Sequence, residues 1–128
     1  MELHGCPGMA KPEKPELRVA FKPIVCAAPL LYAHSHGFFA REGLSVELKL
    51  APGWSGIKEL LVHGFVDAAH MLMPMPFACA MGIDGIQAPI RVGMIQNING
   101  QAITLAKKHL GVRHTAEMKG FTFGVPYL

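Results

Sequence analysis

The chain is poor in charge and in cysteine, and it has no basic cluster and no long uninterrupted hydrophobic run. Only 16% of its 128 residues are charged, the formal net charge is +3, and the lysines and arginines are scattered. A weak, scattered charge excludes the basic stripe of a nucleic-acid-binding surface. The longest nearly uncharged run, 66–82, contains Asp67 and two prolines. It therefore predicts a buried strand and helix, and no transmembrane segment.

Cysteine is too scarce to hold the fold together by several disulfides. Cys6, Cys26 and Cys79 are odd in number and have no CxxC spacing, which favours free, largely buried thiols over a disulfide framework. The first residues show no basic stretch followed by an apolar core, so no secretory signal is visible. We therefore expect a cytoplasmic protein, or a periplasmic one if a leader is missing from this sequence.

What the chain does contain predicts a folded α/β domain. Half of its residues (51%) are hydrophobic, which excludes general disorder. Residues 1–16 hold three prolines among lysine and glutamate and are predicted to be a flexible tail, followed by one ordered lobe over 17–128. The apolar patterns predict strands at 17–21, 44–50, 65–72, 90–95, 102–106 and 121–125, and helical segments at 29–40, 57–62, 74–81 and 115–119. This alternation predicts right-handed crossovers and a mostly parallel sheet flanked by helices.

In such a sheet a ligand binds beyond the carboxyl ends of the strands. The segments 25–29, 52–55 and 71–74 should meet there, each leading into a helix whose first N–H groups attract anions. The segment 52–56 (PGWSG) holds the only tryptophan, Trp54, between glycines that leave it few sequence neighbours to bury it. We therefore predict that Trp54 forms an accessible wall for a small planar ligand. His70, at the end of the third strand, and Gln101, in a turn rich in neutral donors, are further candidate contacts.

No catalytic or metal-binding pattern emerges. The sequence has no HExxH, GxSxG, P-loop or GxGxxG motif, and Cys26 has only apolar neighbours. His34 and His36 are two residues apart on a predicted helix and so point to different faces, and His63 is expected near a helix C-terminus. We predict a binding protein without catalytic residues, metal or cofactor.

Three segments together resemble a known family. They are GFFAREGL at 37–44, GFVDAAHMLMPMP at 64–76 after Trp54, and NINGQ at 97–101. The combination is similar to the nitrate- and bicarbonate-binding branch of ABC-transporter solute-binding proteins, within the nitrate, sulfonate and taurine group. The resemblance covers about 17–128 and implies the first lobe of a periplasmic-binding-protein-like (type II) clamp that closes on a small oxyanion. It implies ligand contacts from Trp54 and Gln101, with Gly100 and His70 beside them, and the second lobe is absent from this sequence.

The resemblance also sets the expected partners and the alternatives. A transport role implies an ABC permease and ATPase as partners, with no direct nucleic-acid contact. The same branch includes a cytoplasmic nitrate/nitrite sensor that regulates an RNA-binding antiterminator, which the missing signal sequence favours. A thiamine-pyrimidine-synthase-like enzyme shares the fold, although that group's cysteine-rich motif is not visible here.

Overall fold

The computed structural model describes residues 11–83, 85, 87–98 and 102–124, and the chain divides into two compact units, 1–96 and 97–128. The first unit is built on a parallel sheet of three strands, β1 (Glu16–Phe21), β2 (Ser45–Leu50) and β3 (Ala68–Ala69), in the order β2-β1-β3. Glu16 lies opposite Ser45 and Val19 opposite Ala68. The predicted α/β architecture with a parallel sheet is confirmed.

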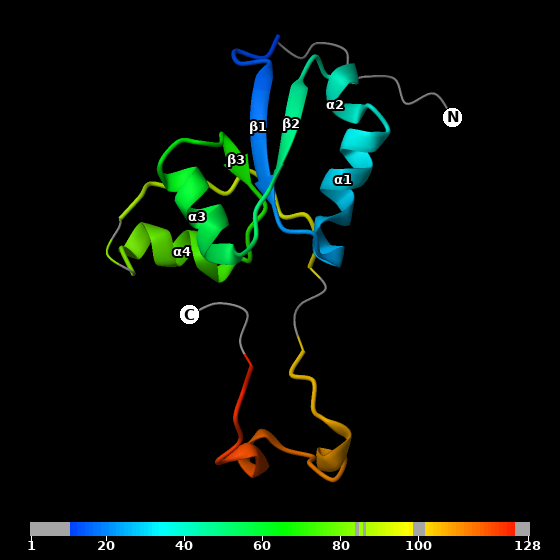
Figure 1. Ribbon diagram of the computed structural model, residues 1–128, viewed down its shortest axis with the longest axis vertical. Coiled ribbons are helices and arrows are strands. Elements are labelled where there is room, and N and C mark those ends of the chain that lie inside the picture. Colours follow the sequence, from blue (N-terminus) through cyan, green and yellow to red (C-terminus); the bar gives the residue numbers. More distant parts are fainter. Residues whose placement is uncertain (1–10, 84, 86, 99–101, 125–128) are drawn as a thin grey trace. The chain divides into compact units, whose positions relative to one another are not determined.

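Each strand leads into a helix (Figure 1). A 3₁₀ turn (Val25–Ala27) and α1 (Ala28–Ser35) follow β1, α3 (Trp54–Val62) follows β2, and α4 (Pro74–Met81) follows β3. Figure 1 shows α1 and the short α2 (Phe38–Arg41) on one side of the sheet, and α3 and α4 on the other. The crossovers from β1 to β2 and from β2 to β3 run in opposite directions along the sheet, so right-handed connections place α1 and α2 on one face and α3 on the other.

Glycines decide where several elements end. The predicted helix 29–40 is broken at Gly37, whose φ of 69° lies in the left-handed region that glycine adopts without strain. Gly43, with φ 74°, ends α2 and turns the chain into β2. At the other boundary β1 begins at Glu16, and the Ser45 N–H donates to the Pro15 carbonyl over 2.7 Å, so the sheet reaches into the segment predicted as tail.

Three predicted strands are wrong. Within the part of the chain that the structure describes, residues 90–95, 102–106 and 121–124 form no strand. An alternating apolar pattern makes a strand only where a neighbouring strand can pair with it, and no ladder reaches these residues. Val92, Met94 and Ile103 are accordingly half or more exposed. The third predicted strand, 65–72, is shortened to Ala68–Ala69 for the same reason, since only these residues pair with β1.

The hydrophobic core of the first unit lies between the sheet and its helices. Its buried apolar residues are Ala20, Ala27, Leu30, Ala51, Trp54, Ile57, Val66, Met75 and Cys79. Among the described residues no helix is long and apolar enough to cross a membrane. The second unit contains the 3₁₀ turns Lys107–His109 and Thr115–Met118, and the rings of His109 and Phe121 pack with their centroids 4.3 Å apart.

Candidate functional site

The loops that follow the three strands meet at the carboxyl edge of the sheet, as predicted. β1, β2 and β3 run parallel, so Lys22, Ala51 and His70 all lie just beyond the ends of their strands. The strand order β2-β1-β3 places the change of crossover direction at β1. Ligand sites of parallel sheets are found at this kind of position.

Trp54 is the first helical residue of α3, which starts three residues before the predicted helix at 57–62, and the prediction of an accessible wall is wrong. Its side chain is only 3% exposed. The ring of His70 packs against it with centroids 5.8 Å apart and planes tilted by 51°, and the Lys22 ammonium lies 5.4 Å from the ring centroid. The neighbouring glycines provide no side chain that could pack on Trp54, but Lys22, which follows β1, and His70, which follows β3, pack against its ring.

His70 is brought against Trp54, and its imidazole is not fully satisfied. The residue is 8% exposed, its backbone N–H donates to Ala20 O over 2.8 Å, and Nδ1 has no hydrogen-bond partner within the described residues. Burial lowers the pKa of His70 below its usual 6.5, which favours the neutral form of the ring. A buried nitrogen without a partner costs about 1–3 kcal/mol, so this atom is available to a ligand or a water molecule.

The three helix starts meet at the rim, but they are not equivalent. At α1 the N–H of Ala28 already donates to Val25 O, and Pro29 has no N–H. At α4 the positions of Pro74 and Pro76 carry no N–H, and the N–H of Met75 donates to Leu72 O over 2.9 Å. The first turns of these two helices therefore offer an anion fewer N–H groups than the expectation of three contributing helix starts implied.

The start of α3 keeps its N–H groups free. The first intrahelical bond runs from Ile57 N–H to Gly53 O over 3.1 Å, so Trp54, Ser55 and Gly56 have no acceptor within the helix. Across the described residues no backbone carbonyl accepts from them and no side chain caps α3. The first turn also holds no acidic residue. Three free donors at the positive end of a helix dipole are suited to one small anion.

Lys22 is the site residue that sequence reasoning missed. It follows the last residue of β1, and the N–H of Ile24 donates back to Lys22 O over 2.8 Å in a three-residue turn centred on Pro23. The available signal was its position: it is the first residue after a strand, immediately before a proline. Gly100 and Gln101 lie outside the described residues, so their predicted contacts stay predictions.

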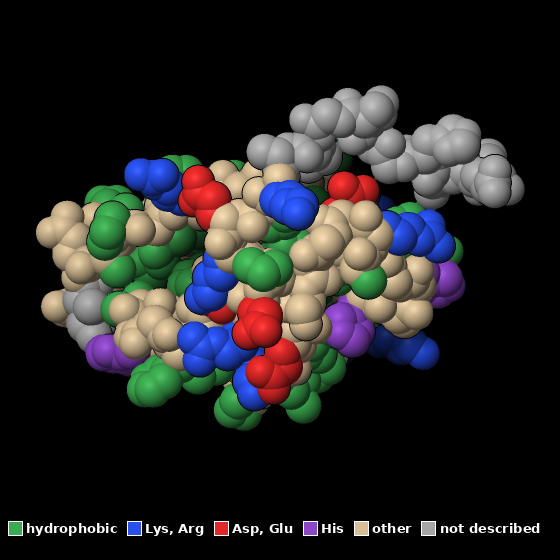
Figure 2. Space-filling model, turned by 90° about the horizontal axis from the view of Figure 1, so that it is seen from above, with side chains coloured by type: hydrophobic (Ala, Val, Ile, Leu, Met, Phe, Trp, Pro, Cys, Tyr) green, Lys and Arg blue, Asp and Glu red, His purple; other side chains and the backbone are tan. Residues whose placement is uncertain are grey.

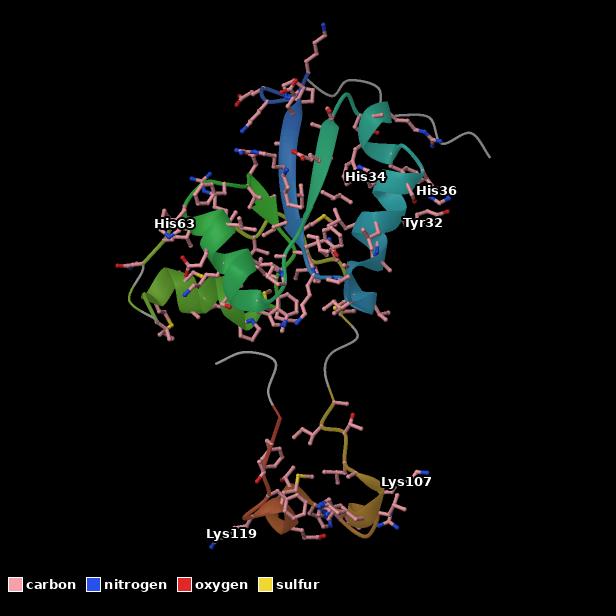
Figure 3. The ribbon with its side chains drawn as sticks, in the orientation of Figure 1. Tyr32, His34, His36, His63, Lys107 and Lys119 are labelled. Atoms are coloured by element: carbon pink, nitrogen blue, oxygen red, sulfur yellow. The ribbon has the colours of Figure 1, made fainter. Side chains whose placement is uncertain are left out.

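The histidines elsewhere do not form a metal centre. Figure 3 shows His34 and His36 on α1 and at its end, and His63 at the end of α3 on the other side of the sheet. His34 Nε2 lies 3.0 Å from Val46 O, and His63 Nε2 lies 3.0 Å from a carboxylate oxygen of Glu59 on its own helix. Within the described ranges no three His, Cys, Asp or Glu side chains are grouped to hold an ion.

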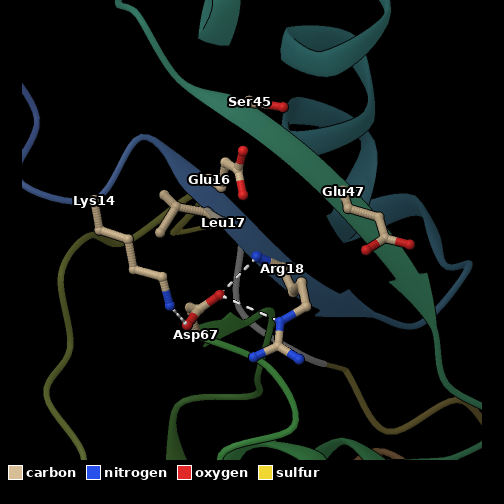
Figure 4. Close-up of a pocket in the computed structure, with 7 residues that line it drawn as sticks. All are labelled: Lys14, Glu16, Leu17, Arg18, Ser45, Glu47 and Asp67. Carbon is tan, nitrogen blue, oxygen red and sulfur yellow. Dashed lines mark hydrogen bonds and ion pairs between the residues drawn. The ribbon is translucent and has the colours of Figure 1, made fainter.

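A depression of about 410 Å³ lies at the opposite, amino edge of the sheet (Figure 4). Asp67 dominates it by accepting from Lys14 Nζ and from the backbone N–H of Arg18 over 2.8 Å, with Arg18 Nε 3.7 Å away. The hydrogen bond from Lys14, then that from the Arg18 backbone, holds the pKa of Asp67 below its usual 3.8. Figure 2, seen from above, shows acidic and basic side chains next to one another on this face. Because these charges pair with one another, we interpret this edge as structural.

The comparisons with known proteins agree with the fold and with the resemblance. The model of the NMT1-like family matches residues 10–125. A bicarbonate transport ATP-binding protein of Synechocystis is 38% identical over 98 residues, which are 75% of this chain and 15% of that protein. A nitrate/nitrite binding protein of Synechocystis, NrtA, is 34% identical over 109 residues, which are 80% of this chain and 24% of that protein.

A solved structure gives the same result. The crystal structure of the periplasmic nitrate-binding protein NrtA from Synechocystis superposes with a TM-score of 0.59 at 34% identity, over 62% of this chain and 23% of that one. The chain thus spans a quarter or less of the length of these relatives. The match to the ATP-binding protein covers 15% of that protein, and the present sequence contains no P-loop motif.

Proposed function

The chain belongs to the NMT1-like family, and we propose that it forms the part of a solute-binding protein that captures a small oxyanion, such as nitrate or bicarbonate, for an ABC transporter. Relatives named for nitrate binding and for bicarbonate transport support this class of ligand. An ABC permease and ATPase are the partners that this role requires. The proposed role is capture and release of the anion, with no chemical step.

The start of α3 is the observation that carries the proposal. Trp54, Ser55 and Gly56 present backbone N–H groups without acceptors among the described residues, at the carboxyl edge of a parallel sheet. A trigonal oxyanion presents several lone pairs to such a turn, and hydrogen bonds to a charged acceptor are the strong ones. These neutral donors select the anion by geometry, because their N–H groups converge on one turn.

We propose Trp54, His70, Gly100 and Gln101 as the ligand-binding residues. Because the Trp54 side chain is buried, its proposed contribution is to fix the position of the first turn and to present its backbone N–H. His70, directly after β3, packs against that ring, and its Nδ1 has no partner among the described residues and so is available for a hydrogen bond. Gly100 and Gln101 are proposed on the resemblance alone, as donors from a separate loop.

Substitution by proline removes a backbone N–H that other substitutions leave in place, so it can test the contribution of that donor. Gly56 is the third residue of α3, the position that Pro76 holds in α4, so Gly56→Pro removes one N–H at a place where a helix accepts proline. Gly56→Ala is the matched control, since its added Cβ meets Pro52 at an ordinary 3.7 Å and the N–H remains. We expect nitrate affinity, measured by calorimetry or by amide chemical shifts, to fall about 10–100-fold in Gly56→Pro and to stay within about twofold in Gly56→Ala.

Circular dichroism must first show that both variants fold. Equal nitrate and bicarbonate affinities in the two folded variants would remove the α3 start as the anion site. Neither the nitrate sensor nor the thiamine-pyrimidine-synthase-like enzyme is favoured by an observation in the described residues. The cytoplasmic location stays a prediction.

A further inference from the structure

Lys22 is fixed in place by a short, rigid turn. Pro23 sets φ near the value that a three-residue turn needs, and the Ile24 N–H closes the turn on Lys22 O over 2.8 Å. Lys22 itself is half-buried, and its ammonium lies 5.4 Å from the Trp54 ring centroid. The contact is within the range of a cation–π interaction, so the aromatic face restrains the charge at the rim.

The charge of Lys22 is not neutralised within the described residues. No ion pair there joins it to a carboxylate, whereas Lys14 and Lys49 pair with Asp67 and Glu47. The ring beneath its ammonium belongs to the first residue of α3, and the first turn of that helix holds no acidic residue that could compensate the charge. His70, on the other contact of Trp54, carries no negative charge that could compensate.

A bound anion would neutralise the Lys22 charge and accept from the free N–H groups of α3 at the same time. It would also have the unpartnered Nδ1 of His70, a side chain more than nine-tenths buried, beside it. We infer that Lys22 is the cation of the anion site, supplied by this lobe and held in place over Trp54. The inference rests on the proposed function and adds a selection rule: the site favours singly charged anions over neutral planar molecules of the same size.

The test compares two lysines that differ in place but not in charge. Lys22→Met keeps an unbranched stem over Trp54 and removes the charge, and Lys49→Met removes the same charge from an exposed lysine paired with Glu47 on β2. Sodium nitrate and sodium bicarbonate are titrated into each ¹⁵N-labelled chain at pH 7, with urea at the same concentrations as the neutral planar probe. The amide shifts of Trp54, Ser55 and Gly56 report occupancy at the α3 start.

We expect nitrate affinity to fall about tenfold in Lys22→Met, to be largely restored in Lys22→Arg, and to change less than twofold in Lys49→Met. Urea should leave the three amides unmoved in the native chain. Lys22→Gln replaces Lys22→Met if the latter does not fold.

Three adverse results have different meanings. If nitrate and bicarbonate fail to move the α3 amides of the native chain, both the proposed function and the role of Lys22 are wrong. If they move those amides equally in the native chain, Lys22→Met and Lys49→Met, the anion site stands and Lys22 is only a cover for the Trp54 ring. Binding of urea with an affinity near that of nitrate would likewise overturn the charge selection.

Discussion

The burial of Trp54 leads to a prediction that separates its structural role from any contact with ligand. The side chain is 3% exposed, so Trp54→Ala removes nearly all of its buried surface. A tryptophan buries about 150–250 Å², which at about 25 cal/mol per Å² corresponds to roughly 4–6 kcal/mol. Measured truncations of large core residues cost about 3–5 kcal/mol, so we expect a loss near 4 kcal/mol. Against a typical total of about 5–15 kcal/mol, this loss removes between about a quarter and four fifths of the stability.

The assay is urea unfolding followed by circular dichroism, because Trp54→Ala removes the only tryptophan and with it the fluorescence signal. Trp54→Phe is the matched variant: it keeps an aromatic ring against His70 and should cost about 1–2 kcal/mol. The native chain provides an independent check, since its single indole should resist quenching by iodide. A cost below about 1 kcal/mol for Trp54→Ala, or ready quenching, would refute the buried placement and restore the exposed wall that the sequence alone suggested.

The remaining predictions concern pH and backbone strain. Burial lowers the pKa of His70 below 6.5, so on acidification the unfolded chain takes up a proton before the folded chain does, and the free energy of unfolding should fall as pH drops below about 6.5. Urea midpoints between pH 5 and 7.5 measure this fall, and a folded His70→Leu variant that shows the same pH dependence would contradict the prediction. The pKa of Asp67 is held below 3.8, so this residue should contribute stability that is present above pH 3.8 and is lost as pH falls through its folded-state pKa. Asp67→Asn should lower the urea midpoint at pH 7 and weaken the fall of stability with acidification. An unchanged pH dependence would count against the Lys14 and Arg18 contacts. Gly64 adopts φ +72° in open space, so Gly64→Ala should cost about 1 kcal/mol through backbone strain alone, and a neutral result would show that the turn relaxes.

Local chemistry explains what the sequence could predict. The alternation over 44–50 and the apolar segment 17–21 predicted two strands whose observed bounds differ by one residue. The prolines at 29 and 74 mark helix starts within one residue of those found, because proline suits the first turn of a helix. These signals depend only on neighbours along the chain, and a parallel sheet then brings the following loops to one edge.

What the sequence could not predict depends on contacts between distant residues. Trp54 was expected to be exposed because its neighbours are glycines, but it is covered by residues 32 positions before it and 16 positions after it, Lys22 and His70. The apolar segments 90–95 and 102–106 have strand-like patterns, yet whether they pair depends on a strand elsewhere. The two prolines of α4, taken as a helix signal, also remove the donors that an anion would need, which becomes evident only when each N–H is followed to its acceptor.

The two edges of the sheet differ in how well their local electrostatics are satisfied, and this difference supports the placement of the site. At the amino edge the half-buried Asp67 is matched by Lys14 and Arg18, so its charge is compensated. At the carboxyl edge, within the described residues, the α3 start has no capping side chain or first-turn acid, the Lys22 ammonium has no ion pair, and His70 Nδ1 has no hydrogen-bond partner. Each of these features costs stability by itself, and an anion would satisfy all of them together. Unsatisfied donors and an unpaired charge gathered at one edge of a sheet are typical of a binding site whose ligand supplies the missing interactions.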